Sequence, residues 1–245
     1  MRETDTFQTN TISLSICVPA YNEEKTLREA VEDLLRHLSP RLRAIEVIIV
    51  NDGSSDRTSQ AADKLGSEKP GVIKVIHHGK NRGLGASYRS ALTAAEGDYF
   101  TWFPADHEDS AESFLKYLPH LEENTVITCH HRGMDPRTEL RKTVSYVYTW
   151  LINAVTGLRL KYYNGLAVYP RRFLESVPGF SGGVLFQAEL LLRANRAGYR
   201  IVEVHVPLGK RLQGKSKILA MNSFFYLLRD FCRLIKISYS SGENI

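Results

Sequence analysis

Short apolar runs that alternate with helical patterns constrain the fold of this chain more than any other feature. Four runs have the length of a strand and are rich in isoleucine, valine or aromatic residues: residues 13–18, 45–50, 72–77 and 98–103. Helical patterns separate them at residues 27–38, 56–65 and 84–95. Strands joined by crossover helices pair in parallel, with helices packed on the sheet. The sequence therefore predicts an α/β fold with a mostly parallel central sheet and helices on both faces.

The second half of the chain is less regular, but it contains the same kinds of element. It predicts helices at residues 111–121, 143–154 and 185–197, and strands at residues 125–129, 163–169 and 199–206. Because no internal repeat or linker interrupts the pattern, we expect a single domain over residues 13–217, after a polar N-terminal extension at residues 1–12. Residues 218–245 are expected to form a C-terminal amphipathic helix and tail.

Hydropathy and cysteine content are those of a cytoplasmic globular protein. No run approaches the ~20 apolar residues of a membrane-spanning helix, and the start, MRETDTFQTNTIS, lacks the apolar core of a signal peptide. The three cysteines have neither metal-ligand nor disulfide spacing. We expect Cys17 and Cys129 to be small buried residues within strands.

Positive charge is concentrated towards the C-terminus. Residues 193–236 contain ten lysines and arginines and two acids, so this segment carries +8, whereas the whole chain carries +5. Such a concentration favours an anionic partner, namely phosphates, nucleic acid or a membrane surface; a solvated charged face is the alternative.

The last predicted helix, residues 218–236, is amphipathic. Phe224, Leu228, Phe231 and Ile235 recur at helical spacing, and basic residues occupy the other side. Two interpretations remain open: the apolar side packs on the protein's own core, or it lies on a lipid interface.

Polar side chains follow each of the first four predicted strands, at the edge of the sheet where ligands of open α/β proteins bind. A carboxylate such as Asp52 can accept hydrogen bonds from a nucleotide base, Tyr21 offers an aromatic face and Glu23 can bond ribose hydroxyls. Asp106 and Glu108, two residues apart, have the chemistry to hold a divalent cation on a pyrophosphate. Together these strand ends predict a nucleotide site.

Other roles remain open for some of these residues. Asp56 suits the cap of the following helix as well as it suits a ligand. Asn81 and Gly83 have the residue types of a simple turn.

Several stretches, in this order along the chain, resemble the family 2 glycosyltransferases of the GT-A fold: CVPAYNEE, VNDGSSDRT, NRGLGAS, an acidic strand end and FQAELLLRANRAGYRIVEVHVP. The resemblance is strongest to polyprenyl-phosphate sugar transferases of the dolichol-phosphate mannose synthase type, and it covers residues 13–217. It implies a Rossmann-like GT-A domain that inverts the anomeric carbon of a sugar donated by a GDP- or UDP-linked nucleotide sugar. The nucleotide-binding residues expected from the resemblance are Pro19, Tyr21, Glu23, Asp52, Asn81, Gly83 and Asp106.

The metal motif departs from the family pattern. Where the family has Asp-x-Asp, this chain has Pro104-Ala105-Asp106, so proline replaces the first aspartate, and Glu108 stands where the family often has glutamine. Asp106 and Glu108 are therefore the expected ligands of Mg²⁺ or Mn²⁺, together with the donor phosphates.

A second matching segment follows the last predicted strand. GKRLQGKSK resembles the family's Arg-x-x-Gly-x-Ser-Lys, which implies phosphate contacts from Arg211, Ser216 and Lys217. Asp106, Glu189 and Arg211 are the expected catalytic residues.

An alcohol acceptor needs a general base, for which Glu189, Glu108 and Asp109 are candidates. A phosphate acceptor is already an anion and needs none. Glu189 also suits a structural acid on its helix.

The favoured acceptor is a polyprenyl phosphate at a membrane surface, contacted through residues 218–236. A soluble small-molecule acceptor and a non-catalytic sugar-nucleotide binding protein are the alternatives. A nicotinamide dehydrogenase is excluded, because the glycine run at residues 83–85 follows the third strand rather than the first. A nucleic-acid-binding module does not explain the polar strand ends, so no nucleic-acid partner is expected.

Overall fold

A central sheet organises the protein. The computed structural model describes residues 11–106, 110–131, 138–183, 185–207 and 222–239, and the strands within them form one sheet in the order β3-β2-β1-β4-β6-β5-β7. Neighbouring strands are parallel except at β6, which is antiparallel to β4 and to β5. The strands are β1 (Ser13–Ala20), β2 (Ala44–Asn51), β3 (Ile73–His77), β4 (Tyr99–Trp102), β5 (Thr125–His130), β6 (Ala167–Pro170) and β7 (Arg200–His205). The predicted α/β class and mostly parallel sheet are confirmed.

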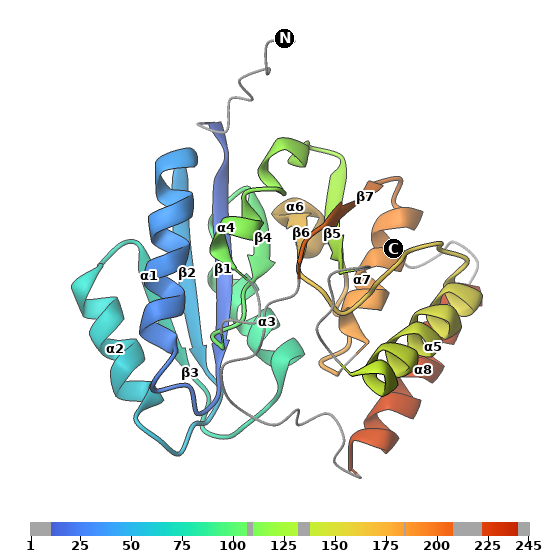
Figure 1. Cartoon of the computed structure of the whole chain (residues 1–245), viewed down its shortest axis with the longest axis horizontal. Coiled ribbons are helices and arrows are strands. Elements are labelled where there is room, and N and C mark those ends of the chain that lie inside the picture. Colours follow the sequence, from blue (N-terminus) through green and yellow to red (C-terminus); the bar gives the residue numbers. More distant parts are fainter. Residues whose placement is uncertain (1–10, 107–109, 132–137, 184, 208–221, 240–245) are drawn as a thin grey trace.

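Helices cover both faces of this sheet (Figure 1). One face packs against α1 (Leu27–Leu38), α2 (Thr58–Glu68) and α4 (Ala111–Phe114). The other packs against α3 (Leu84–Ala94), α6 (Arg171–Ser176) and α7 (Phe186–Arg196). Two further helices, α5 (Glu139–Thr156) and α8 (Asn222–Tyr239), lie beyond β5 and α7, and short 3₁₀ turns span Ser39–Arg41 and Leu118–His120.

The central strands contribute side chains to two hydrophobic cores, one on each face of the sheet. In β2, Val47 and Ile49 belong to the cluster under α1 and α2, whereas Ile48 and Val50 belong to the cluster under α3 and α7, and all four are completely buried. Successive side chains of a strand point to opposite faces, so a strand covered on both sides must be apolar throughout. Cys17 in β1 and Cys129 in β5 are buried in the same way, as predicted.

Three elements differ from the sequence prediction. The helix expected at residues 111–121 ends at Phe114 and is followed by a 3₁₀ turn, because Pro119 lacks an amide hydrogen and disfavours helix in the residue before it. The strand expected at residues 163–169 begins only at Ala167 and runs antiparallel to its neighbours. The short helix α6, directly after Pro170, was not predicted.

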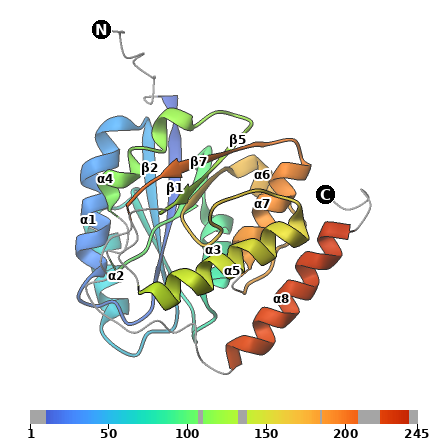
Figure 2. The ribbon, with the colours of Figure 1, turned by 45° about the vertical axis from the view of Figure 1, so that its right-hand side comes forward.

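The C-terminal helix packs on the protein itself. α8 lies beside α5 and also contacts α7 (Figure 2), and its Asp230 and Leu234 are buried. Within the described part of α8, Phe231 and Leu234 pack on the protein's own core, whereas Ile235 is exposed; contact of this helix with a lipid interface stays a prediction. None of the described helices is long and apolar enough to span a bilayer.

Candidate functional site

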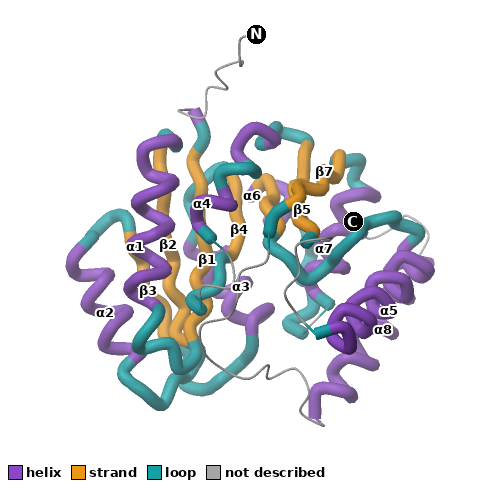
Figure 3. The backbone as a smooth tube through the Cα atoms, viewed as in Figure 1, coloured by secondary structure: helices purple, strands orange, loops and turns teal. Residues whose placement is uncertain are grey.

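The loops that follow β1, β2 and β3 gather at one edge of the sheet (Figure 3). These three strands run in the same direction, so their carboxyl ends meet there. The predicted nucleotide residues Pro19, Tyr21, Glu23 and Asp52 lie at this edge, as do Asn81 and Gly83 after β3.

Hydrogen bonds that involve side chains connect the first two of these loops. The Asn22 amide oxygen accepts a hydrogen bond from Ser55 N at 2.8 Å, and Asn22 N donates to Ser54 Oγ at 3.0 Å. Glu23 N donates to Thr58 Oγ1 at 2.8 Å. Asn22 has a φ of 58°, which is uncommon for a residue other than glycine. Its two bonds across the loops stabilise this conformation, so the polar residues after β2 hold the β1–α1 loop in place.

Asp52 joins the second loop to the third. Its side chain is buried, and Oδ1 accepts hydrogen bonds from His78 Nδ1 at 2.6 Å and from Arg82 N at 2.9 Å. Oδ2 accepts a hydrogen bond from Gly83 N at 2.8 Å. The other ring nitrogen of His78, Nε2, lies 2.9 Å from Ser90 Oγ in α3. Because a carboxylate oxygen has two lone pairs, Oδ2 keeps capacity for one donor from a ligand.

Gly53 permits this arrangement. Its φ is +71°, and a Cβ at this position would lie 2.4 Å from the Lys80 carbonyl carbon and 2.6 Å from Asn81 N. Glycine is therefore required here twice, by the left-handed backbone and by the close approach of the β3–α3 loop.

Asp56 acts at the start of α2. One oxygen accepts the Thr58 amide hydrogen at 3.0 Å, and the other accepts that of Glu24 at 3.3 Å. Partial burial tends to raise the pKa of Asp56, but hydrogen bonds from the Thr58 hydroxyl and amide and from the Glu24 amide outweigh it and hold the pKa below its ordinary value of 3.8. The helix-start role left open by the sequence is the one seen here.

A single predicted metal ligand lies in the described part of the chain. Asp106 follows β4 and is half-buried, while Pro104 is buried beside it. Glu108 and the alternative base Asp109 lie outside the described residues, as do the predicted phosphate contacts Arg211, Ser216 and Lys217. The described residues contain no cluster of three or more histidine, cysteine, aspartate or glutamate side chains able to hold a metal ion. One carboxylate at this strand end fits a cation held mainly by substrate phosphates, which is how Mg²⁺ is usually bound.

Glu189 sits at the junction of α7 and α8. It is buried, and its oxygens accept hydrogen bonds from Arg233 Nε at 2.9 Å, Arg193 Nε at 3.1 Å and Ser181 N at 3.0 Å. These contacts give Glu189 the structural role that the sequence left open; the role of general base stays a prediction.

The partners of the predicted residues were not found from the sequence. His78 and Asn22 hold two of the loops, yet no spacing in the chain pairs His78 with Asp52, 26 residues away. The sequence does contain one signal, the polar residues that follow each of the first strands. This signal indicates which edge of the sheet holds the site, but not which side chains form hydrogen bonds there.

The fold and these strand-end loops define a glycosyltransferase of the GT-A type. Residues 15–178 match the family model described as glycosyl transferase family 2, and the chain belongs to this family. It is 26% identical over 236 residues to a dolichol-phosphate mannosyltransferase of Pyrococcus furiosus, covering 92% of this chain and 64% of that protein. It is 38% identical over 172 residues to the human dolichyl-phosphate beta-glucosyltransferase, covering 61% of this chain and 52% of that protein.

Solved structures agree on the fold. Glucosyl-3-phosphoglycerate synthase from Mycobacterium tuberculosis, in complex with Mn²⁺, UDP and phosphoglyceric acid, superposes with a TM-score of 0.69 at 20% identity, covering 95% of this chain and 80% of that one. The chain spans less than two thirds of the length of the two curated relatives.

Proposed function

We propose that this protein is an inverting glycosyltransferase that moves a sugar from a GDP- or UDP-linked donor to a polyprenyl phosphate at a membrane surface. Two observations support a nucleotide-sugar donor: membership of glycosyl transferase family 2, and the hydrogen-bonded loops at the carboxyl edge of the sheet. The names of the curated relatives, which act on dolichyl phosphates, support the acceptor half.

The observation that carries the lipid acceptor is the outer face of α5. Leu140, Val144, Val147 and Leu151 follow one another at helical spacing and are all exposed, and the Trp150 side chain beside them is 66% exposed. Among the described residues, six of the nine exposed large apolar side chains are on α5 and two are on α8. Exposed apolar surface of this extent marks an interaction site. With tryptophan and tyrosine in it and basic side chains on the neighbouring α8, the surface suits an anionic lipid interface.

The chemistry follows from the strand-end residues. Asp52 and Tyr21 hold the nucleotide base, and Glu23 the ribose. Asp106 and Glu108 would hold Mg²⁺ or Mn²⁺, and the ion would supply positive charge against the departing diphosphate. An oxygen of the acceptor phosphate attacks the anomeric carbon from the face opposite the diphosphate, the bond to the diphosphate breaks, and the configuration inverts. Arg211 and Lys217 stabilise the phosphates.

The surroundings of Glu189 support a phosphate acceptor. Both carboxylate oxygens of Glu189 already accept hydrogen bonds, from Arg193, Arg233 and Ser181 N, so structural contacts occupy this buried side chain. A phosphate acceptor is already charged and requires no base, whereas an alcohol acceptor requires one.

Thermal unfolding with nucleotides tests the donor half first. UDP, GDP, CDP and dTDP are each added with and without Mn²⁺, and we expect one of UDP and GDP to raise the melting temperature, more so with the metal. Asp52→Asn abolishes this shift, whereas Asp63→Asn, at an exposed carboxylate on α2, leaves it unchanged. Absence of a shift with every nucleotide refutes nucleotide binding.

Transfer tests the acceptor half. Radiolabelled UDP-glucose or GDP-mannose is incubated with the protein, Mn²⁺ and vesicles with or without undecaprenyl or dolichyl phosphate. The proposal expects label in the organic phase only when the polyprenyl phosphate is present. Label on a soluble acceptor instead identifies a small-molecule transferase, and nucleotide binding with no turnover identifies a binding protein.

A further inference from the structure

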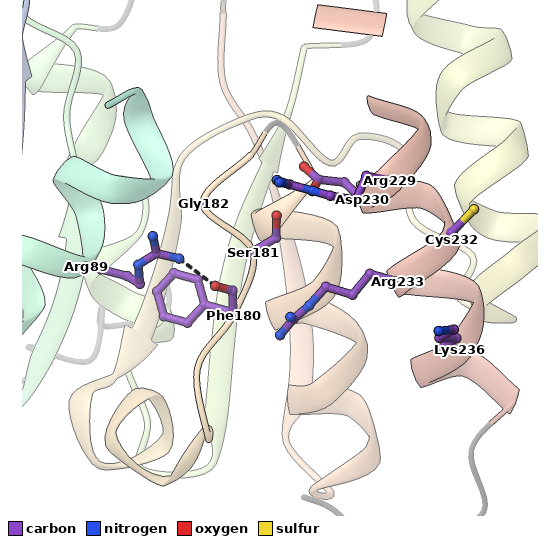
Figure 4. A pocket seen from close by; sticks show the side chains of 9 residues that line it. All are labelled: Arg89, Phe180, Ser181, Gly182, Arg229, Asp230, Cys232, Arg233 and Lys236. Carbon is purple, nitrogen blue, oxygen red and sulfur yellow. Dashed lines mark hydrogen bonds and ion pairs between the residues drawn. The ribbon is translucent and has the colours of Figure 1, made fainter. Parts of the chain in front are cut away.

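A basic cavity lies between α3, α8 and the loop at residues 179–183, which connects α6 to α7 (Figure 4). It has a volume of about 630 Å³, and Arg89, Arg229, Arg233 and Lys236 line it. None of the strand-end residues assigned to the donor lines this cavity. Two of its residues, Ser181 and Arg233, contact Glu189, the buried carboxylate at the junction of α7 and α8.

Close contacts fix the wall of the cavity. Arg89 donates a hydrogen bond to the Phe180 carbonyl at 2.6 Å, and Arg233 Nη2 donates to the Gly179 carbonyl at 3.0 Å. A Cβ on Gly182 would lie 2.8 Å from Arg89 Nη2, so the missing side chain leaves this guanidinium uncovered. The loop is thus held by α3 on one side and α8 on the other, and no large rearrangement is needed to present these cations.

Positive charge dominates the lining. Among the described lining residues, the four cations are accompanied by one acid, Asp230, which is buried and accepts a hydrogen bond from Arg229 at 3.3 Å. Glu189, which does not line the cavity, forms an ion pair with Arg233. Arg193 pairs with the same carboxylate, so Glu189, Arg193 and Arg233 together carry one net positive charge. A net excess of three positive charges in a concave space favours a multiply charged anion.

The hydrogen-bond donors that line the cavity indicate which kind of anion it binds. Arg233 directs Nε and Nη2 at Glu189 and Gly179, and within the described residues its Nη1 keeps both hydrogens for a ligand. Planar guanidinium groups suit the tetrahedral oxygens of a phosphate, and Lys236 adds a flexible ammonium.

We propose that this cavity binds the phosphate group of a ligand other than the sugar donor. The phosphate belongs either to a soluble phosphomonoester or to the headgroup of an anionic phospholipid. This assignment depends on the cavity alone, so it stands or falls independently of the proposed transferase activity.

Cys232 provides a reporter inside the cavity. It lines the cavity and is exposed, whereas Cys17 and Cys129 are buried. The full chain is treated with N-ethylmaleimide, a neutral reagent, and the rate of modification of Cys232 is followed by peptide mass spectrometry. One arm contains glycerol 3-phosphate, and the other contains vesicles of phosphatidylcholine with or without phosphatidic acid, whose headgroup is also a phosphomonoester. Sodium chloride keeps the ionic strength equal throughout.

We expect a phosphate source to slow the modification of Cys232 at least about threefold, and the arm in which this happens identifies the source. The double variant Arg229→Ala/Lys236→Ala raises the concentration for half-protection at least about tenfold. The matched double variant Arg36→Ala/Lys64→Ala, at exposed cations of α1 and α2, leaves it unchanged.

The proposal is overturned by no protection in either arm. It is equally overturned by protection that survives in Arg229→Ala/Lys236→Ala or that is lost to the same extent in the control variant. Far-ultraviolet circular dichroism of both variants confirms that they are folded.

Discussion

At the residue scale, single side chains set the distances between the loops of the carboxyl edge. Asp52 and Gly53 act together: the carboxylate draws the β3–α3 loop in through Arg82 N and Gly83 N, and the glycine leaves room for it. A small change at either residue moves the surface on which a nucleotide is expected to rest.

Gly53→Ala is predicted to destabilise the protein by about 3 kcal/mol or more. The left-handed conformation costs an alanine roughly 1–2 kcal/mol, and the contact with the Lys80 backbone adds to this cost. Gly71→Ala is the matched control, because Gly71 has a φ of +80° but no atom within 4 Å of its Cβ position. Urea unfolding of both variants measures the difference; equal losses contradict the importance of the loop contact.

Asp56 is predicted to stabilise the protein at neutral pH and to lose this effect in acid. Its pKa is lowered in the folded state, so its contribution is present above the unfolded pKa and disappears as the pH falls through the folded pKa, below 3.8. Asp56→Ala, which removes the acceptor oxygens, lowers the free energy of unfolding by about 1 kcal/mol at pH 7. Urea titrations from pH 7 to pH 2.5 check this, and a difference between variant and wild type that does not shrink in acid is the contrary result.

At the element scale, α8 is attached through charge as well as apolar contact. Leu234 is buried in the hydrophobic cluster under α3 and α7, and Arg233 donates a hydrogen bond to Glu189 on α7. Glu189 is 2% exposed, and a buried carboxylate depends on its cations.

Arg233→Ala is predicted to cost about 2 kcal/mol, because hydrogen bonds to charged groups contribute about 1.5–3 kcal/mol and Arg193 still pairs with Glu189. Lys236→Ala, three residues along the same helix, is expected to stay within about 0.5 kcal/mol. Chemical denaturation of both compares them. A loss in Arg233→Ala no larger than that in Lys236→Ala indicates that apolar packing alone holds α8.

At the scale of the whole molecule, the two ends of the sheet differ in what they expose. The strands β1 and β2 lie between helices that bury their apolar side chains, whereas α5, beyond β5, buries Thr149 and Ile152 and presents exposed apolar side chains to the outside. This asymmetry among the described elements is the basis of the proposed contact between α5 and a membrane surface.

Val147→Ser/Trp150→Ser is predicted to weaken vesicle binding at least about tenfold. Full burial of such side chains is worth roughly 1.5–3 kcal/mol each, and a factor of ten corresponds to about 1.4 kcal/mol. Flotation with vesicles containing phosphatidylglycerol measures it. Leu84→Ser, at an exposed apolar residue outside α5, serves as the control; unchanged binding of the α5 variant contradicts a membrane role for this face.

The sequence by itself determined the class of fold and the edge of the sheet that holds the predicted site. Strand segments such as 47–50, buried on both faces, are apolar throughout, and polar groups gather where such strands end. These are local rules, and they located the elements of the first half to within a few residues. The same rules failed at residues 111–121 and 163–169, where a proline and an antiparallel strand interrupt the regular alternation.

Only the tertiary structure decided which side chains meet. The pairing of Asp52 with His78, the close approach of Gly53 to Lys80 and the ion pair of Glu189 with Arg233 each join residues that are 26 or more positions apart. Likewise, the periodicity of Leu140, Val144 and Val147 predicts a helix with an apolar face, but not whether that face is covered. Periodicity reports the geometry of one element, whereas contact and exposure depend on how all the elements pack, and that is a property of the whole chain.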